Sequence, residues 1–304
     1  MFLVRTDHDL HGAPIPSLTS KLIAVLAKNP DTEEIVFTYQ RYSDYEFVLN
    51  EPTHRSFEGK DVVLFLDYEI AEFFHRSLFL KETIRRQKPR SLIVLLPLFP
   101  FARSDKHEPE SISSCQLLLE TLTEGITLLI TVNFHNPEML RFARSKVVNL
   151  LESLPIVEYY QLQNPKTPIH RIVAADDGAA NFAHQVGQLS GRPVLVAEQI
   201  RTGSMKSLRS LELIPEDQTV LLLDDITRSG QTLLNIIEAF PKIMFHVYVT
   251  HSYLGSTRLK LSKLTNCVSF ECSNTIDREG TIDLTSLLIW QILTALPGSD
   301  DHVS

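Results

Sequence analysis

The sequence predicts an α/β protein of two domains, each a mainly parallel sheet flanked by helices. Apolar runs of strand length recur along the 304 residues and alternate with amphipathic stretches of helix length. Such alternation is typical of parallel sheets, because a crossover helix must return the chain to the same edge. Leu-Pro, Asn-Pro and Thr-Pro pairs between Leu150 and Pro168 interrupt the pattern, which then starts again. We therefore expect domains over residues 1–148 and 149–304.

The expected strands are short runs rich in Val, Ile and Leu, and the expected helices are the amphipathic stretches between them. The strands cover residues 34–39, 61–66, 91–97, 127–133, 171–175, 193–197, 219–223, 244–250 and 267–270. The helices cover residues 18–27, 71–86, 113–124, 180–189 and 232–240. A last helix over residues 284–296 either closes the second domain or crosses back to the first. Ligands of such sheets bind at the carboxyl ends of strands, so the segments that follow the strands are the candidate sites.

Composition narrows the function classes. With 43% hydrophobic and 22% charged residues, the chain can build full cores. Its net charge of −8 argues against general affinity for nucleic acids or anionic membranes, so any phosphate site must be local. The three cysteines have no metal-binding spacing and cannot all pair, which favours a reducing compartment, and we expect a cytoplasmic protein. No leader-like N-terminus or long apolar stretch indicates secretion or membrane insertion.

The segment from Val220 to Thr232 carries the strongest functional signal. An apolar strand ends in two carboxylates, Asp224 and Asp225, and continues through hydroxyl residues and Gly230 into a helix. Unpaired N–H groups at a helix start, together with loop hydroxyls, suit a phosphate. The carboxylates suit sugar hydroxyls or a hydrated Mg²⁺. The segment therefore predicts a site for a phosphorylated sugar, although a buried strand that ends in a solvated acidic turn gives a similar pattern.

This spacing resembles the binding loop of type I phosphoribosyltransferases and of the ribose-phosphate diphosphokinases, also called PRPP synthetases. The resemblance implies that Asp224 and Asp225 grip the ribose 2- and 3-hydroxyls of ribose 5-phosphate. It also implies a loop that wraps the 5-phosphate, made of Thr227, Arg228, Ser229, Gly230, Gln231 and Thr232. Both domains would then have the type I phosphoribosyltransferase-like fold.

Two further segments resemble the nucleotide site of PRPP synthetases. The segment 97–105 reads Pro-x-Phe-x-Phe-Ala-Arg-x-Asp, which simple transferases lack, and it implies ATP binding by Arg103 and Asp105. Its two aromatic residues could stack on the base, although the segment also fits a charged surface loop. Residues 42–46 resemble Phe-Ser-Asp-Gly-Glu and imply that Asp44 and Glu46 bind nucleotide from a neighbouring subunit.

The remaining resemblances concern metal binding and complete the order of motifs along the chain. His135 stands where the family has a Mg²⁺-ligating histidine, and Asn133 replaces the aspartate of that motif. Asp176 stands where an aspartate binds metal and ribose phosphate. Residues 248–255 and 272–276 resemble two more motifs of the family. The chain is therefore identified as a divergent member of the PRPP synthetase family.

The resemblance implies transfer of the diphosphoryl group of MgATP to the 1-hydroxyl of ribose 5-phosphate, giving PRPP and AMP. Mg²⁺ is the implied cofactor, ATP and ribose 5-phosphate are the implied partners, and a homo-oligomer, dimer or hexamer, is expected. Arg201 keeps a catalytic position, but Gln199 stands where the family has a lysine, and we hypothesise that Lys206 or Lys106 supplies the missing charge. Two alternative functions remain open: a phosphoribosyltransferase that uses PRPP, and a non-catalytic regulatory subunit. A different 5-substituted ribose as the acceptor is also open, because Arg228 and Gln231 alter the phosphate loop.

Overall fold

The computed structural model describes residues 1–6, 17–41, 47–50, 56–66, 73–105, 113–197, 200–202, 205–207, 209–216, 218–253, 255–276 and 280–297. The chain forms two compact units: Met1–Leu150 together with Thr285–Ser304, and Leu151–Leu284. This division differs from the expected second domain of residues 149–304, because helix α8 (Thr285–Ala295) packs on helix α1 (Ser17–Leu26) of the first unit. The last helix therefore crosses back, which was one of its two expected positions.

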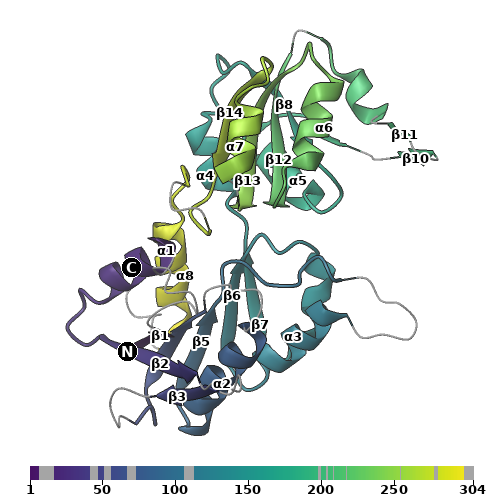
Figure 1. Cartoon of the computed structure of the whole chain (residues 1–304). Coiled ribbons are helices and arrows are strands. Elements are labelled where there is room, and N and C mark those ends of the chain that lie inside the picture. Colours follow the sequence, from purple (N-terminus) through teal and green to yellow (C-terminus); the bar gives the residue numbers. More distant parts are fainter. Residues whose placement is uncertain are drawn as a thin grey trace. The chain divides into compact units, whose positions relative to one another are not determined.

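The first unit is built on a seven-stranded sheet with the order β3-β2-β1-β4-β5-β6-β7 (Figure 1). Its strands are β1 (Phe2–Thr6), β2 (Glu33–Arg41), β3 (Phe47–Asn50), β4 (Asp61–Phe65), β5 (Ser91–Leu95), β6 (Leu128–Val132) and β7 (Lys146–Leu150). All neighbours pair in parallel except β2 and β3. Helices α2 (Phe73–Arg86) and α3 (Ser114–Thr123) contribute Leu80, Ile84 and Leu118 to the main core on one face.

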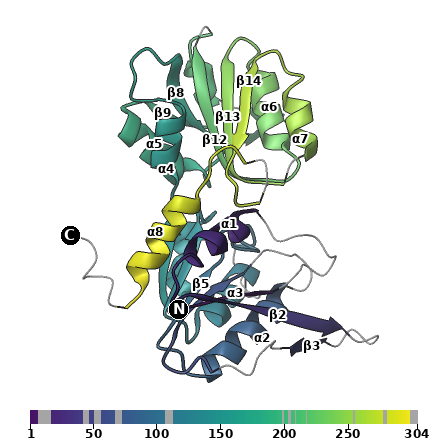
Figure 2. The same ribbon diagram turned by 90° about the vertical axis from the view of Figure 1, so that its left-hand side faces the viewer.

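The second unit is a five-stranded parallel sheet with the order β14-β13-β12-β8-β9. Its strands are β8 (Ile169–Ala174), β9 (Val194–Val196), β12 (Thr219–Thr227), β13 (Met244–Ser252) and β14 (Cys267–Cys272). Helices α4 (Ser153–Tyr159) and α5 (Ala180–Ser190) cover one face, and α6 (Gln231–Ala239) and α7 (Gly255–Leu261) cover the other (Figure 2). A separate antiparallel pair, β10 (Ile200–Thr202) and β11 (Met205–Ser207), completes the unit.

The predicted α/β class is confirmed. Each apolar run predicted as a strand is a strand, because strands buried on both faces of a parallel sheet read as continuous apolar sequence. Residues 221–223 at the centre of β12, for example, are fully buried. Among the described helices, none combines the length and apolarity that crossing a membrane requires.

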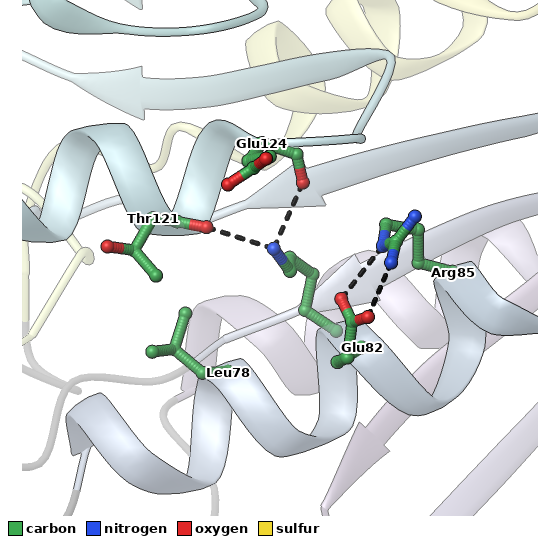
Figure 3. Close-up of a pocket in the computed structure, with 6 residues that line it drawn as sticks. Leu78, Glu82, Arg85, Thr121 and Glu124 are labelled. Atoms are coloured by element: carbon green, nitrogen blue, oxygen red, sulfur yellow. Dashed lines mark hydrogen bonds and ion pairs between the residues drawn. The ribbon is translucent and has the colours of Figure 1, made fainter.

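Lys81 joins helices α2 and α3 in the first unit. Its Nζ donates hydrogen bonds to the carbonyl oxygens of Thr121, at 2.9 Å, and Glu124, at 3.0 Å (Figure 3). These carbonyls lie at the end of α3, where backbone acceptors lack partners within the helix and a cation is favoured by the helix dipole. Burial lowers the pKa of Lys81. Lys81 also lines a pocket of about 410 Å³ at this helix end, together with Leu78, Glu82 and Arg85.

Candidate functional site

The carboxyl ends of two neighbouring strands bring three aspartates together in the second unit. Strand β12 pairs in parallel with β8, so the residues that end both strands meet at one edge of the sheet. Asp224 and Asp225 end the apolar part of β12, and Asp176 follows β8. One carboxylate oxygen from each of the three lies within 4.8 Å of the others. The roles predicted from the sequence, ribose hydroxyls for Asp224 and Asp225 and metal and ribose phosphate for Asp176, stay predictions.

Local contacts hold the three carboxylates in place. The N–H of Asp225 donates to Oδ1 of Asp224 at 3.0 Å, and the N–H of Ala179 donates to Oδ1 of Asp176 at 3.3 Å. Asp224 and Asp225 are 2% and 1% exposed, whereas Asp176 is half-buried, so the cluster is reached from the Asp176 side. Buried carboxylates so close repel one another unless a cation or protons intervene.

The donor set fits a hard divalent cation. Oxygens bound to one octahedral Mg²⁺ are about 3 to 4 Å apart, because Mg–O distances are about 2.1 Å. Three carboxylate oxygens within 4.8 Å reach that spacing with small side-chain rotations, or bind through metal-bound water. No other group of three or more acidic, histidine or cysteine ligands lies within such a distance in the described part of the chain. The proposed metal ligand His135 belongs to the first unit, at the end of β6, and its role stays a prediction.

The loop after β12 has the form that the sequence predicted. Gly230 has a φ of +68°, a left-handed conformation that glycine adopts without strain, and it precedes the first residue of α6. Oγ1 of Thr227 accepts from the N–H of Gly230 at 3.2 Å, and Oγ of Ser229 accepts from the N–H of Gln231 at 3.4 Å. Because both hydroxyls act as acceptors in these bonds, their hydrogens can still be donated to a phosphate.

The outer residues of this loop are partly or fully exposed, and two of them contact neighbouring side chains. Arg228 and Ser229 are exposed, and Thr232 is half-buried in the first turn of α6. The guanidinium of Arg228 lies 5.1 Å from the ring centroid of Tyr253. The Nε2 group of Gln231 donates to Oδ1 of Asn235 at 2.7 Å, so this amide lies along the helix. The loop therefore presents hydroxyls, helix amides and one arginine.

Glu152 is part of this edge, and the sequence prediction missed it. Its side chain is fully buried, and Oε1 accepts hydrogen bonds from the hydroxyls of Tyr248, at 3.1 Å, and Thr250. Burial raises its pKa to about 7, and the charge of Asp225 adds to the effect. Position 250 of β13 lies alongside position 225 of β12, since the register pairs Asp224 with Val249 and Ile226 with His251. Nothing in the surrounding Leu-Leu-Glu-Ser-Leu sequence marks this carboxyl as buried.

The two motifs predicted at residues 248–255 and 272–276 pack against each other. The hydroxyls of Ser273, at 2.6 Å, and Thr275, at 3.1 Å, donate to the carbonyl oxygen of Thr250. The Nδ1 atom of His251 is 2.9 Å from Oγ1 of Thr275. These buried contacts fix the carboxyl end of β13 beside the acidic pair.

The predicted ATP-binding loop is only partly described. Arg103 is exposed, and Oδ2 of Asp105 accepts from Nδ2 of Asn136 at 2.7 Å, which ties this loop to the segment after His135. The expectation that both aromatic residues of the loop could stack on a base fails for Phe99. This residue is 2% exposed and packs on Phe134 at a centroid distance of 5.0 Å, because it continues the apolar side of β5 into the core.

Several predicted residues carry no side-chain description. Asp44 and Glu46 lie outside the described residues, as do Gln199 and Lys106. Arg201 lies in β10, where only its backbone is described, and its register partner across the pair is Lys206 of β11. Asn133 is 4% exposed with a φ of +39°, and its N–H donates to the carbonyl of Leu150 at 2.8 Å. Asparagine tolerates such a conformation better than most residues.

Comparison with known proteins agrees with this arrangement. No protein-family model matches the chain. A ribose-phosphate pyrophosphokinase of Pyrococcus furiosus is 27% identical over 175 residues, which cover 57% of this chain and 61% of that protein. The mitochondrial ribose-phosphate pyrophosphokinase 3 of Spinacia oleracea is 28% identical over 172 residues, which cover 53% of this chain and 42% of that protein. The chain thus spans about half the length of these relatives.

The crystal structure of phosphoribosylpyrophosphate synthetase from Mycobacterium smegmatis matches the fold over nearly its whole length. It superposes with a TM-score of 0.73 at 18% identity, and the match covers 96% of this chain and 97% of that one. The chain therefore has the two-unit α/β fold of that protein, and its second unit contains an acidic strand end followed by a hydroxyl-glycine loop. In sequence, the chain is similar to ribose-phosphate pyrophosphokinases over part of its length, and in fold it is similar to a PRPP synthetase.

Proposed function

We propose that the chain is a ribose-phosphate diphosphokinase. The oxygen of the ribose 1-hydroxyl attacks the β-phosphorus of ATP, the bond between that phosphorus and the oxygen of the α-phosphate breaks, and AMP leaves. The hydroxyl proton is lost to solvent, and the product is PRPP. Such transfers need mainly positioning and positive charge on the spreading negative charge.

The observation that carries this proposal is the convergence of Asp176, Asp224 and Asp225 beside the hydroxyl-glycine loop. In the proposed role, the acidic pair accepts hydrogen bonds from the ribose 2- and 3-hydroxyls, and the loop from Thr227 to Thr232 holds the 5-phosphate. Asp176 and its neighbours would hold Mg²⁺, which supplies positive charge to the phosphates when bound. The loop also lies at the start of α6, where the helix dipole favours an anion.

We place the nucleotide on the first unit. Arg103 is exposed, and a guanidinium can pair with phosphate oxygens. Asp105 is held by Asn136, next to the proposed metal ligand His135. We propose that Asp44 and Glu46 complete the ATP site of a neighbouring subunit in a homo-oligomer. Light scattering would measure the mass of this homo-oligomer.

Arg201 is the proposed catalytic cation, and the register of the β10–β11 pair supports Lys206 as its companion. Residues 201 and 206 are directly opposite each other. A lysine at position 206 can therefore supply the charge that Gln199 does not. If Lys206→Ala and Lys106→Ala both leave the rate of AMP release unchanged, this substitution hypothesis is wrong.

The experiment that tests the function is incubation of the full chain with Mg²⁺, ATP and ribose 5-phosphate, with AMP and PRPP followed by phosphorus NMR. We expect AMP and PRPP in equal amounts, only when the sugar phosphate is present. Asp224→Asn should remove this activity, and the exposed-site control Glu238→Asn should retain it. Absence of AMP formation by the wild-type chain in the presence of Mg²⁺, ATP and ribose 5-phosphate would reject the proposal.

A non-catalytic regulatory subunit is the second candidate. It is favoured by Gln199 and by Asn133, which stands buried where a charged ligand is expected. This candidate predicts nucleotide and ribose 5-phosphate binding without AMP release, which calorimetry with the same protein would detect. A transferase that uses PRPP would need no ATP, so ATP binding distinguishes it from both.

A further inference from the structure

The end of β13 lies directly beside the loop that follows β12. The N–H of Tyr253 donates to the carbonyl oxygen of Thr227 at 3.2 Å, and Ser252 is the register partner of Thr227. Tyr253 is therefore fixed to the first residue of the loop, although it is 26 positions further along the chain. The motif that predicted the loop contains only the β12 side of this arrangement.

Buried contacts hold the segment that precedes Tyr253. The preceding residues Thr250, His251 and Ser252 are all at least 98% buried. The carbonyl of Thr250 accepts from two hydroxyls of the next strand, and His251 contacts one of them. Tyr253 itself is half-buried, so its ring has a defined position relative to the loop.

The exposed guanidinium of Arg228 lies over this ring. The separation of 5.1 Å is within the range of about 6 Å over which a cation is attracted to an aromatic face. A stacked guanidinium uses its flat face, and its N–H groups point outward in the ring plane. Stacking on Tyr253 therefore limits the rotamers of Arg228 without using the donors that bind phosphate bidentately.

The charge of Arg228 matters because its surroundings are acidic. It is the only lysine or arginine between Asp224 and Thr232, and three carboxylates converge at the same strand edge. An anion approaching the loop is repelled by these carboxylates and attracted by Arg228 and the α6 dipole. A fixed arginine is thus the one side-chain charge of the loop that favours a doubly negative group.

We propose that Tyr253 is a positioning residue that holds Arg228 against the anionic substituent on the fifth carbon of the sugar acceptor, so that the pair selects phosphorylated over unphosphorylated ribose. This inference rests on the proposed function, in which ribose 5-phosphate is the acceptor. Arg228 contacts the phosphate, and Tyr253 acts only through Arg228.

The test is calorimetric titration of the full chain with ribose 5-phosphate and with ribose, without ATP. Arg228→Ala should weaken ribose 5-phosphate binding about 10-fold to 100-fold, the range for loss of a charge-assisted hydrogen bond. Tyr253→Leu should weaken it about 3-fold to 10-fold, since the charge remains but loses its fixed position. Tyr253→Phe keeps the ring and should bind as the wild type does, and Tyr159→Leu, an exposed tyrosine of the same unit, is the matched control.

The double variant separates positioning from general damage to the fold. In the Arg228→Ala background, Tyr253→Leu should cause no further loss, and neither change should alter the affinity for ATP. If wild type binds ribose 5-phosphate and Tyr253→Leu binds equally well, or loses affinity equally in the Arg228→Ala background, this inference alone is overturned. If the wild type does not bind ribose 5-phosphate at all, the proposed function fails, and this inference fails with it.

Discussion

Replacement of the buried Glu152 by glutamine should change how the stability of the second unit depends on pH. The pKa of Glu152 is raised from 4.5 to about 7, mainly by burial. The folded state therefore binds this proton more tightly than the unfolded state does. The stabilisation by this bound proton is complete below the pKa of the unfolded state. It falls as pH rises through the window between the two pKa values, and it is absent above about 7.

The size of the effect follows from that window. A difference of this size in pKa corresponds to about 3 kcal/mol, and the slope near the middle of the window is about 1.2 kcal/mol per pH unit. Glutamine cannot ionise, but its oxygen can still accept from Tyr248 and Thr250. Its amide group would replace Oε2, which has no hydrogen-bond partner among the described residues, at a cost of about 1 to 3 kcal/mol at every pH.

The assay is hydrogen exchange of the β13 amides, measured in EDTA at several values between about pH 5 and about pH 8. This probe reports on the second unit, whereas the single tryptophan, Trp290, belongs to α8 of the first. Relative to wild type, Glu152→Gln should gain about 3 kcal/mol of opening free energy between the acidic and the basic end. Glu238→Gln, an exposed site on α6, is the control. If the difference in opening free energy between Glu152→Gln and wild type stays constant over this range, or changes in the opposite direction, the reasoning is refuted.

Two other predictions concern the first unit and the thiols. Lys81→Met should lower the free energy of unfolding by about 1 to 3 kcal/mol, because two carbonyls at the end of α3 lose their hydrogen-bond donor. Thermal denaturation would measure this loss, with Lys60→Met, a substitution of an exposed lysine, as the control. Burial raises the pKa of Cys115 to about 12 and that of Cys267 to about 11, so both thiols should react with a disulfide reagent at about pH 8 only after denaturant is added. Rapid reaction of either in the native protein would contradict this.

Sequence patterns predicted most strands of the two main sheets, but they missed β1 inside the first sheet as well as β3 and β7 at its edges. Buried parallel strands are apolar throughout, so β5 and β12 could be predicted directly. Strand β7 is half-buried along most of its length, and its Lys-Val-Val-Asn-Leu sequence lacks that signal. Helix α4 contains Pro155 in its first turn, where proline is tolerated, whereas the Leu-Pro pair by itself predicts only a break in the pattern.

The candidate site shows the same limit. The acidic pair, the hydroxyls and Gly230 are consecutive in sequence, so their spacing alone indicates the chemistry. Glu152 and Tyr253 join the site through pairing of β12 with β13 and packing of α4, which no local pattern encodes. The predicted stacking of Phe99 on a base is wrong because an aromatic residue after a buried strand fits a hydrophobic core as well as a nucleotide site.

Repulsion within the cluster of Asp176, Asp224 and Asp225 opposes folding. Removal of one charge therefore distinguishes a cluster that binds a cation from one that stabilises the fold. Each pair of carboxylates within 4.8 Å repels by about 1 to 3 kcal/mol, depending on the effective dielectric constant. Asp224→Asn keeps an oxygen that can accept from the N–H of Asp225, so it removes charge with little change in shape. In EDTA the variant should therefore be more stable than wild type, while its affinity for Mg²⁺, measured by calorimetry, should fall at least about 10-fold. A variant that loses stability in EDTA and retains its Mg²⁺ affinity would mean that the three carboxylates serve the fold and not a cation.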